Sequence, residues 1–345
     1  MRRREFLLAA AAVPDMTIVQ FEETLSAMRK VHYGRRTVDI LNTGFRPVGG
    51  SVADFAAVGH QGRLHFFYIE RRLAEGTPFY PGHEIYFGHA STANFFDWEV
   101  HDPVLLIRPG TWEGGHMWAP SILPHQGEFV MAYTGVNANI SQDLGIASSR
   151  DLFEWRRWDT NPISLWKKAR WMHWRPDAIS SCRDPYLFRH DGRIWMTYTA
   201  NTRDPAPCVA LASTTDLREW EDHGPILKGP VGGYEPRLQG GHPQGSLESS
   251  SLVHRNGRWL LLVHAARRGA TVRNWVFESA DMLRFDLDSG REFWPGAYTT
   301  EIVKEKDGRA LLACAGQIRF GEVNWMDPRP TARFLRTREQ IEAWL

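Results

Sequence analysis

The sequence predicts an all-β fold, a five-bladed β-propeller, because one short phrase recurs at a fixed spacing. Four glycines, each followed by a hydrophobic stretch, lie 65 residues apart, at Gly62, Gly127, Gly192 and Gly257. A weaker fifth copy starts at Gly308 after a shorter interval. Self-similarity at a fixed period indicates repeated supersecondary units. Units of this length that contain only strand and turn signals are typical of propeller blades.

A second phrase repeats with the same period and is predicted to form a turn near the outer edge of each blade. It ends at Trp155 in one copy and at Trp220 in the next, again 65 residues later. Residues 91–98 and 279–285 are degenerate copies. A tryptophan at this position is expected to fill the space between neighbouring blades, since one such ring buries about 150 Å² or more. Most of the 15 tryptophans are therefore interpreted as structural rather than sugar-binding.

The repeats occupy most of the chain and leave no room for a second domain. We expect the propeller at residues 50–337, an N-terminal segment at 16–49 with some helix near Val19 to Lys30, and a C-terminal helical turn at 338–345. Thr337 and Gln340 are spaced as a helix cap. Residues 1–15 resemble a twin-arginine export signal. Alternatively translation begins at Met16, so the location is open between the cytoplasm and export.

Composition excludes several classes of function. The formal net charge is +1, from 41 basic and 40 acidic residues, which gives no electrostatic footprint for nucleic acid. No apolar run reaches the ~18 residues of a membrane span. Cys182, Cys208 and Cys314 are too few and too scattered for a disulfide framework or a zinc site, and are expected to be reduced. We assign no cofactor and no metal ligand. The sequence does not indicate an oligomeric state.

Each glycine phrase follows a short strand, and the first residue of that strand marks one equivalent position in every repeat. The residues are Asp54, Ala119, Asp184 and Glu248, which precede the glycines by 8, 8, 8 and 9 positions. The innermost strands of a propeller surround one axis, so these positions should converge on one cavity. Three carboxylates there indicate a catalytic or binding site, and we expect their carboxyl carbons to lie within about 12 Å of one another.

These residues make the chain similar to the five-bladed propeller glycoside hydrolases. The nearest resemblance is to glycoside hydrolase family 43 (arabinofuranosidases, xylosidases and arabinanases), through Asp54, the Trp118-Ala119-Pro120 phrase, Asp184-Pro185 and Glu248. This resemblance implies that Asp54 is the general base and Glu248 the general acid. It also implies that Asp184 orients the acid and tunes its pKa. The proline that family 43 has after its first aspartate and the Gly-Pro after its glutamate are missing.

Other features resemble the fructan-acting families 32 and 68. Arg183-Asp184-Pro185 matches their Arg-Asp-Pro motif, in which the aspartate stabilises the transition state. Their Asn-Asp-Pro-Asn phrase around the nucleophile is absent, and Ser249 replaces the cysteine that follows their acid. No β-sandwich of the family 32 type is expected after the fifth blade.

The three carboxylates suit glycoside hydrolysis, which needs one carboxylic acid to protonate the departing oxygen and one carboxylate on the opposite face of the sugar. The acid must hold its proton near neutral pH. Glu248, with Asp184 nearby as a like charge, is the natural acid. Asp54 is then the base of an inverting enzyme or the nucleophile of a retaining one. The family 43 resemblance favours inversion, whereas the Arg-Asp-Pro motif leaves retention open.

Further side chains are candidates for contact with the carbohydrate substrate. Trp118 could stack on a sugar ring or pack in the core, and His116 could bind a hydroxyl group. Arg183 should alternate to the strand face opposite Asp184, but could reach a carboxylate or form a structural ion pair. His242 and Gln244 lie in a glycine-rich loop that leads to Glu248.

Three functions are compatible with these residues. The leading one is hydrolysis of a furanoside or pentoside bond of the arabinofuranosidase or xylosidase type. The second is a fructosidase or fructosyltransferase, and the third is a carbohydrate-binding propeller without catalysis. Nitrophenyl furanosides and pyranosides, together with sucrose and inulin, would separate the three.

Overall fold

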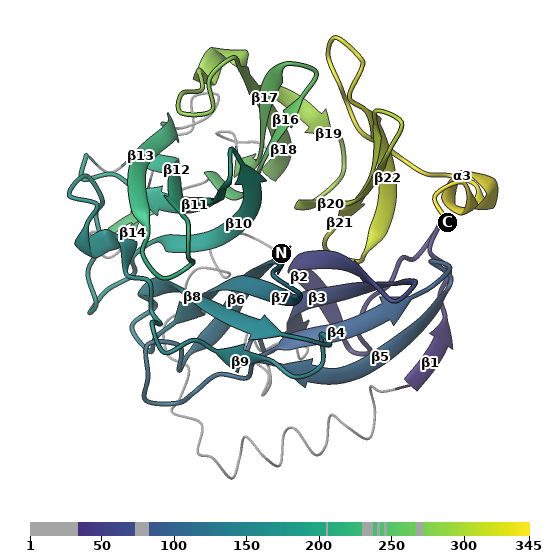
Figure 1. The fold of residues 1–345 in the computed structure, drawn as a ribbon, viewed down its shortest axis with the longest axis horizontal. Coiled ribbons are helices and arrows are strands. Elements are labelled where there is room, and N and C mark those ends of the chain that lie inside the picture. Colours follow the sequence, from purple (N-terminus) through teal and green to yellow (C-terminus); the bar gives the residue numbers. More distant parts are fainter. Residues whose placement is uncertain are drawn as a thin grey trace.

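The computed structural model describes residues 34–72, 83–204, 206–229, 237–239, 242–244, 247–266 and 272–345. Five antiparallel sheets surround one axis, which confirms the predicted all-β five-bladed propeller (Figure 1). In the part of the chain described, helix is confined to η1 (Leu165–Lys167), η3 (Leu287–Ser289) and α3 (Arg338–Glu342). The helix expected near Val19 to Lys30 falls outside the described residues.

The blades follow one another in chain order, each running from the axis outward. Blade I contains β2 (Gly50–His60), β3 (Arg63–Arg72), β4 (Phe87–Thr92), β5 (Asp97–Val104) and, at its outer edge, β1 (Gly34–Thr37). Blade II contains β6 (His116–His125), β7 (Glu128–Val136), β8 (Gln142–Ser149) and β9 (Arg156–Arg157). Blade III contains β10 (Cys182–His190), β11 (Arg193–Asn201), β12 (Pro207–Thr214) and β13 (Glu221–Lys228).

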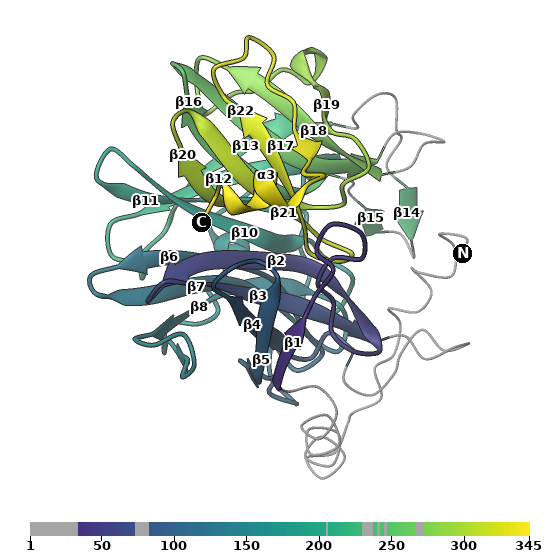
Figure 2. The same cartoon turned by 90° about the vertical axis from the view of Figure 1, so that its right-hand side faces the viewer.

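Blade IV contains β16 (Leu247–Arg255), β17 (Arg258–Ala266), β18 (Val272–Ser279) and β19 (Arg291–Trp294). Blade V contains β20 (Thr300–Lys306), β21 (Arg309–Cys314), β22 (Arg319–Asn324) and β23 (Arg333–Phe334). A small hairpin of β14 (Arg237–Gln239) and β15 (His242–Gln244) precedes blade IV and lies on one face of the ring (Figure 2).

The repeated glycine completes the tight turn between the first two strands of every blade. Its φ is positive in all five copies, and so is the φ of the residue before it, as in Gln61 (47°) and Gly62 (73°). Two successive positive φ values define the type I′ turn, which matches the twist of a β-hairpin. Glycine is favoured in this turn because it adopts a positive φ without steric strain. This turn is the physical reason for the 65-residue signal.

Backbone hydrogen bonds close the ring between the first and last blades. Phe45 and Ile318 exchange a pair of N–H···O bonds of 2.9 and 2.7 Å, and Val52 and Gly316 exchange another of 3.1 and 2.7 Å. Helix α3 follows blade V, and its residue Ile341 is buried in the same hydrophobic cluster as Phe45. The first and last blades are thus joined by both main-chain hydrogen bonds and apolar packing.

The hydrophobic core consists of five clusters, each at the junction of two neighbouring blades. The tryptophans of the second repeated phrase lie there, as expected. Trp98 and Trp220 are almost fully buried, Trp155 is half-buried, and each indole donates to the carbonyl three residues earlier. Cys182, Cys208 and Cys314 are buried free thiols, as expected from their number and spacing.

Trp220→Ala is expected to destabilise the fold by about 3–5 kcal/mol, because it leaves a large cavity between blades II and III. Trp220 is 3% exposed and packs in the cluster shared by these blades. The matched control is Leu283→Ala, since Leu283 is 45% exposed and its loss should cost within about 0.5 kcal/mol. Equal shifts of the denaturation midpoint in the two variants would contradict the packing role.

Among the described residues, no helix is both long enough and apolar enough to span a bilayer.

Candidate active site

The expected central positions coincide with a break in strand pairing. The register between the first and second strands shifts between Val52 and Phe55, Trp118 and Ser121, Arg183 and Tyr186, and Glu248 and Ser251. At three of these bulges a residue other than glycine has a positive φ, namely Ala119 (43°), Asp184 (56°) and Ser249 (50°). Such backbone strain is concentrated at functional sites, and bulges re-aim the side chains beside them.

The assignment of Glu248 to the same repeat position as Asp184 is wrong by one residue. Ser249 carries the positive φ of the bulge, and Glu248 pairs with His264 as Arg183 pairs with Thr199. Glu248 is therefore the equivalent of Arg183. The offset of nine residues to Gly257, against eight in the other repeats, was the sequence signal of this difference.

Arg183 nevertheless brings two of the expected carboxylates together. Its Nε lies 3.2 Å from Oδ2 of Asp184, and its Nη2 donates to Oε2 of Glu248 over 2.9 Å. Because both carboxylates contact one guanidinium group, they meet the expected separation limit. The expectation that Arg183 would face away from Asp184 is wrong, since the bulge breaks strand alternation at this point.

Asp184 is held rigidly at the end of the inner strand. Its Oδ2 accepts from the backbone N–H of Ser249 (3.1 Å) and from the Thr199 hydroxyl (3.2 Å). Its own N–H donates to the Thr134 hydroxyl over 3.0 Å. The carboxylate is 5% exposed. These contacts tie blades II, III and IV to one oxygen-rich point near the axis.

Asp54 reaches the same point from blade I. Its carboxylate accepts a hydrogen bond from the Ser249 side chain and lies close enough to Glu248 and Arg71 for their charges to affect its pKa. One of its oxygens, Oδ1, is buried and has no hydrogen-bond partner in the described part of the chain. Within the described residues this oxygen is therefore an unused hydrogen-bond acceptor.

Burial and mutual repulsion raise the pKa values of these acids. Burial raises the pKa of Asp54, and the charge of Glu248 adds to this effect. Burial also raises the pKa of Asp184 to about 7, with Asp54 and Glu248 adding to the shift and Arg183 opposing it. These shifts favour the protonated forms of Asp54 and Asp184, and raised pKa values of this kind are typical of sites that carry out acid–base catalysis.

An ion-pair network around Glu84, which the sequence did not indicate, lies beside the site formed by Asp54, Asp184 and Glu248. Arg71 donates to Oε1 of Glu84 (2.8 Å), and the indole of Trp118 donates to Oε2 of Glu84 (2.6 Å). Although burial opposes it, Arg71 holds the pKa of Glu84 well below its usual range. Arg71 also hydrogen-bonds Tyr298. Glu84 and Arg71 were missed because neither occupies an equivalent position in several repeats.

The aromatic candidates of blade II belong to this network around Glu84. Trp118 is half-buried, and its ring stacks on the buried His116 at 5.5 Å between centroids and 20° between planes. Trp118 also packs against the hydrophobic cluster between blades I and II, so it belongs in part to the core. His242 and Gln244 are in strand β15, but their side chains lie outside the described part of the structure.

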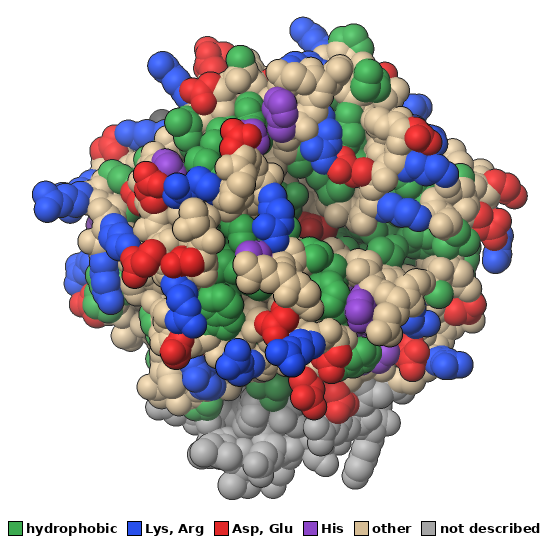
Figure 3. Space-filling model, viewed as in Figure 1, with side chains coloured by type: hydrophobic (Ala, Val, Ile, Leu, Met, Phe, Trp, Pro, Cys, Tyr) green, Lys and Arg blue, Asp and Glu red, His purple; other side chains and the backbone are tan. Residues whose placement is uncertain are grey.

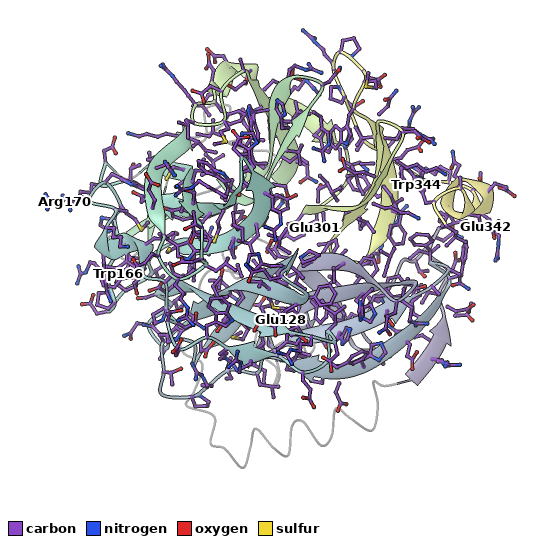
Figure 4. All side chains as sticks on the ribbon, viewed as in Figure 1. Glu128, Trp166, Arg170, Glu301, Glu342 and Trp344 are labelled. Atoms are coloured by element: carbon purple, nitrogen blue, oxygen red, sulfur yellow. The ribbon has the colours of Figure 1, made fainter. Side chains whose placement is uncertain are left out.

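Glu301 is a further acid that the repeat pattern did not indicate. It lies on the inner strand of blade V, close to the ring axis (Figure 4), where the surface is hollowed (Figure 3). Burial raises its pKa, and the charge of Asp54 adds to this shift. By contrast, Trp166, which stacks on Trp174 at 3.9 Å, is at the periphery of the ring (Figure 4).

Comparison with known proteins decides between the two families that the sequence resembles. Residues 55–235 match the glycosyl hydrolases family 32 N-terminal domain. The chain belongs to glycosyl hydrolase family 32. The expectation of a propeller glycosidase is thus confirmed at the level of the family. The prediction that family 43 is the nearest family is wrong, and so is the prediction of an arabinofuranosidase- or xylosidase-like function that depended on it.

Curated relatives of this family 32 chain are a little over a quarter identical to it within the aligned segments. A sucrose-6-phosphate hydrolase of Klebsiella pneumoniae is 26% identical over 289 residues, which cover 77% of this chain and 56% of the relative. The insoluble β-fructofuranosidase isoenzyme CWINV4 of Arabidopsis thaliana is 29% identical over 149 residues, covering 39% of this chain and 23% of the relative. The chain therefore spans about half, or less, of the length of these relatives.

Solved structures show that the fold is shared by both families. A GH32 β-fructofuranosidase of Bombyx mori has a TM-score of 0.63 at 18% identity, over 92% of this chain and 69% of that one. A thermostable family-43 glycoside hydrolase has a TM-score of 0.58 at 14% identity, over 87% of this chain and 97% of that one. At these identities the likeness concerns the fold alone, which explains why the sequence also resembles family 43.

Proposed function

We propose that this chain is a β-fructofuranosidase, which hydrolyses the bond between a terminal β-fructofuranosyl group and its leaving group. The observation that carries the proposal is the placement of Arg183, which binds Asp184 and Glu248 in the site that Asp54 completes. The match to the family model includes Arg183 and Asp184 but stops short of Asp54 and Glu248. Their roles therefore depend on the geometry.

Asp54 is proposed as the nucleophile of a retaining mechanism. Its Oδ1 has no partner in the described part of the chain, so it can approach the anomeric carbon without first breaking a hydrogen bond. The Ser249 side chain binds the carboxylate and helps to hold it in place. Attack by this oxygen forms a covalent fructosyl-enzyme intermediate, which water then hydrolyses.

Glu248 is proposed as the acid that protonates the leaving oxygen and then as the base that activates water. It is about 30% exposed, whereas Asp184 is 5% exposed, so Glu248 has better access to a leaving group and to water. Asp184 cannot rotate freely, because Ser249, Thr199 and Arg183 all bind one oxygen. A fixed carboxylate beside the sugar ring stabilises the positive charge that develops in the transition state.

Substrate release distinguishes this proposal from its competitors. We expect the purified chain to release fructose from sucrose, sucrose 6-phosphate or inulin, and to leave nitrophenyl arabinofuranosides and xylosides intact. Retention predicts methyl β-fructofuranoside as a product when methanol is added, because the covalent intermediate can be captured from the same face. Sugar binding without turnover would favour the non-catalytic propeller, and exclusive formation of the α-anomer would exclude Asp54 as nucleophile.

Asp184→Asn is expected to move the acidic limb of the pH profile of kcat/KM to lower pH. The limb reports ionisation of the nucleophile in the free enzyme. Asp54 and Asp184 repel each other, so removing one negative charge favours the ionised form of Asp54 and lowers its pKa. The profile should be measured with fructosyl fluoride to retain a measurable rate. An unchanged or raised acidic limb would contradict this coupling.

A further inference from the structure

Three histidines of blade I lie together, away from the carboxylate site. His65 on β3, His89 on β4 and His101 on β5 each place a ring nitrogen within 4.8 Å of the other two. Nδ1 of His65 is 2.9 Å from Nε2 of His89. The three strands are neighbours in the sheet, so the cluster crosses most of the width of the blade.

The other blades show that this arrangement is not required by the fold. The positions equivalent to His65 in blades II, III and IV hold Val130, Trp195 and Leu260, and those equivalent to His89 hold Ile146, Leu211 and Val276, judged by strand register. Three blades therefore place apolar side chains where blade I places two buried imidazoles. Packing alone therefore does not explain why blade I has histidines at these two positions.

The third histidine, in contrast, has a structural counterpart. His101 contacts the Ser91 hydroxyl through Nε2 (2.8 Å), and His223 of blade III contacts Ser213 through Nε2 at the same distance. In both blades an arginine also donates to this serine, Arg63 in blade I and Arg193 in blade III. Of these two blades, blade I alone combines the serine–histidine pair with two further imidazoles.

Two of the three imidazoles are shielded from solvent, since His65 is 3% exposed and His89 is fully buried. Nε2 of His89 lies 2.9 Å from Nδ1 of His65, whereas Nδ1 of His89 has no hydrogen-bond partner among the described residues. Burial lowers the pKa of His65 to about 4 and lowers the pKa values of His89 and His101, so the rings are neutral at neutral pH. Neutral imidazole is the form that binds metal ions.

We propose that His65, His89 and His101 form a structural binding site for one divalent transition-metal ion, with zinc as the preferred type. Imidazole ligands suit zinc, cobalt, nickel and copper. Zinc–nitrogen bonds of about 2.0–2.1 Å in tetrahedral geometry place two ligand nitrogens about 3.3 Å apart. The 2.9 Å between His65 and His89 needs only a small adjustment to reach this separation.

The surroundings favour a structural rather than a catalytic ion. The Phe153 ring of blade II lies 5.0 Å from His89 and 5.1 Å from His101, between centroids, and restricts access to the fourth coordination position. The nearby positive charge of Arg63 is offset by Glu99 at 3.4 Å. An ion held by β3, β4 and β5 would cross-link three strands of blade I and stabilise the folded state.

The proposal is tested with the tag-free, chelator-treated full chain titrated with Co²⁺ and then Zn²⁺. We expect one equivalent of Co²⁺ with the visible absorption of a tetrahedral site, displacement by Zn²⁺, and a higher unfolding temperature with Zn²⁺. His89→Phe and His101→Gln should each weaken binding at least tenfold and abolish the thermal shift. His223→Gln is the matched control, because it removes the equivalent serine contact in a blade that lacks the other imidazoles.

Two outcomes would overturn the proposal. One is the absence of stoichiometric binding by the folded wild-type chain, in which case the short contact between His65 and His89 is an ordinary hydrogen bond. The other is unchanged binding in both His89→Phe and His101→Gln, which would place the metal elsewhere. If His89→Phe fails to fold, His101→Gln decides alone, since His101 is only half-buried at the edge of the cluster.

Discussion

Asp54→Asn is expected to reduce kcat by roughly 10⁴–10⁶-fold on every substrate, because it removes the group that attacks the anomeric carbon. The loss should be equally severe for sucrose and for fructosyl fluoride, since a good leaving group does not replace a nucleophile. Substrate binding should be largely kept, because asparagine has the same shape and can still accept a hydrogen bond from Ser249. Steady-state kinetics and calorimetric binding of sucrose measure the two effects separately.

A smaller side chain at this position provides the matching control. In Asp54→Gly, added azide can enter the vacated space and attack from the same face as the missing carboxylate. We expect partial recovery of activity on fructosyl fluoride and formation of an α-fructosyl azide, the product of a single inversion. Recovery with the β-product, or full activity of Asp54→Asn on fructosyl fluoride, would contradict the assignment of Asp54.

Glu248→Gln is expected to have the second largest effect, and this effect should depend on the leaving group. On sucrose the rate should fall by about 10²–10⁴-fold, the usual contribution of general acid–base catalysis. On fructosyl fluoride the formation of the intermediate should change much less, because fluoride departs without full protonation. The second step still needs a base, so the intermediate should accumulate as a burst of released fluoride.

The comparison between substrates is its own control, because a misfolded variant would lose activity on both. Glutamine keeps an oxygen that can accept from Arg183, as Glu248 does at 2.9 Å, so the geometry of the site should be preserved. Equal losses in the rate of intermediate formation from sucrose and from fructosyl fluoride, in a variant that still binds sugar, would contradict the role of Glu248 as acid. No loss in either Glu248→Gln or Asp54→Asn, with sugar binding intact, would favour a binding module.

Much of the architecture could be predicted from the sequence because its signals are local. The type I′ turn needs a positive φ at Gly62 and at its four equivalents, so the same residue recurs at the same place in each blade. The tryptophans at 98, 155 and 220 recur because each blade presents the same gap to its neighbour. Repeat spacing therefore predicted the number of blades, their order and the convergence of inner strands.

The site was only partly predictable for the same reason. Asp54, Asp184 and Glu248 were found because they lie at or beside repeat positions. The family was misjudged because fold-level motifs are shared by families 32 and 43, whereas the match over residues 55–235 is to family 32. Arg71, Glu84 and Glu301 were missed because none of them recurs at one equivalent position in several repeats, and their contacts depend on the folded chain.

The repeat in the sequence by itself predicted the propeller. It also predicted that acidic residues on the inner strands lie together near the propeller axis. Only the tertiary structure decided which groups touch. It showed that a bulge aims Arg183 at both Asp184 and Glu248, and it brought together His65, His89 and His101 from three strands. Contacts of this kind depend on strand register and backbone torsion, which a shift of one residue alters and which the repeat spacing alone does not determine.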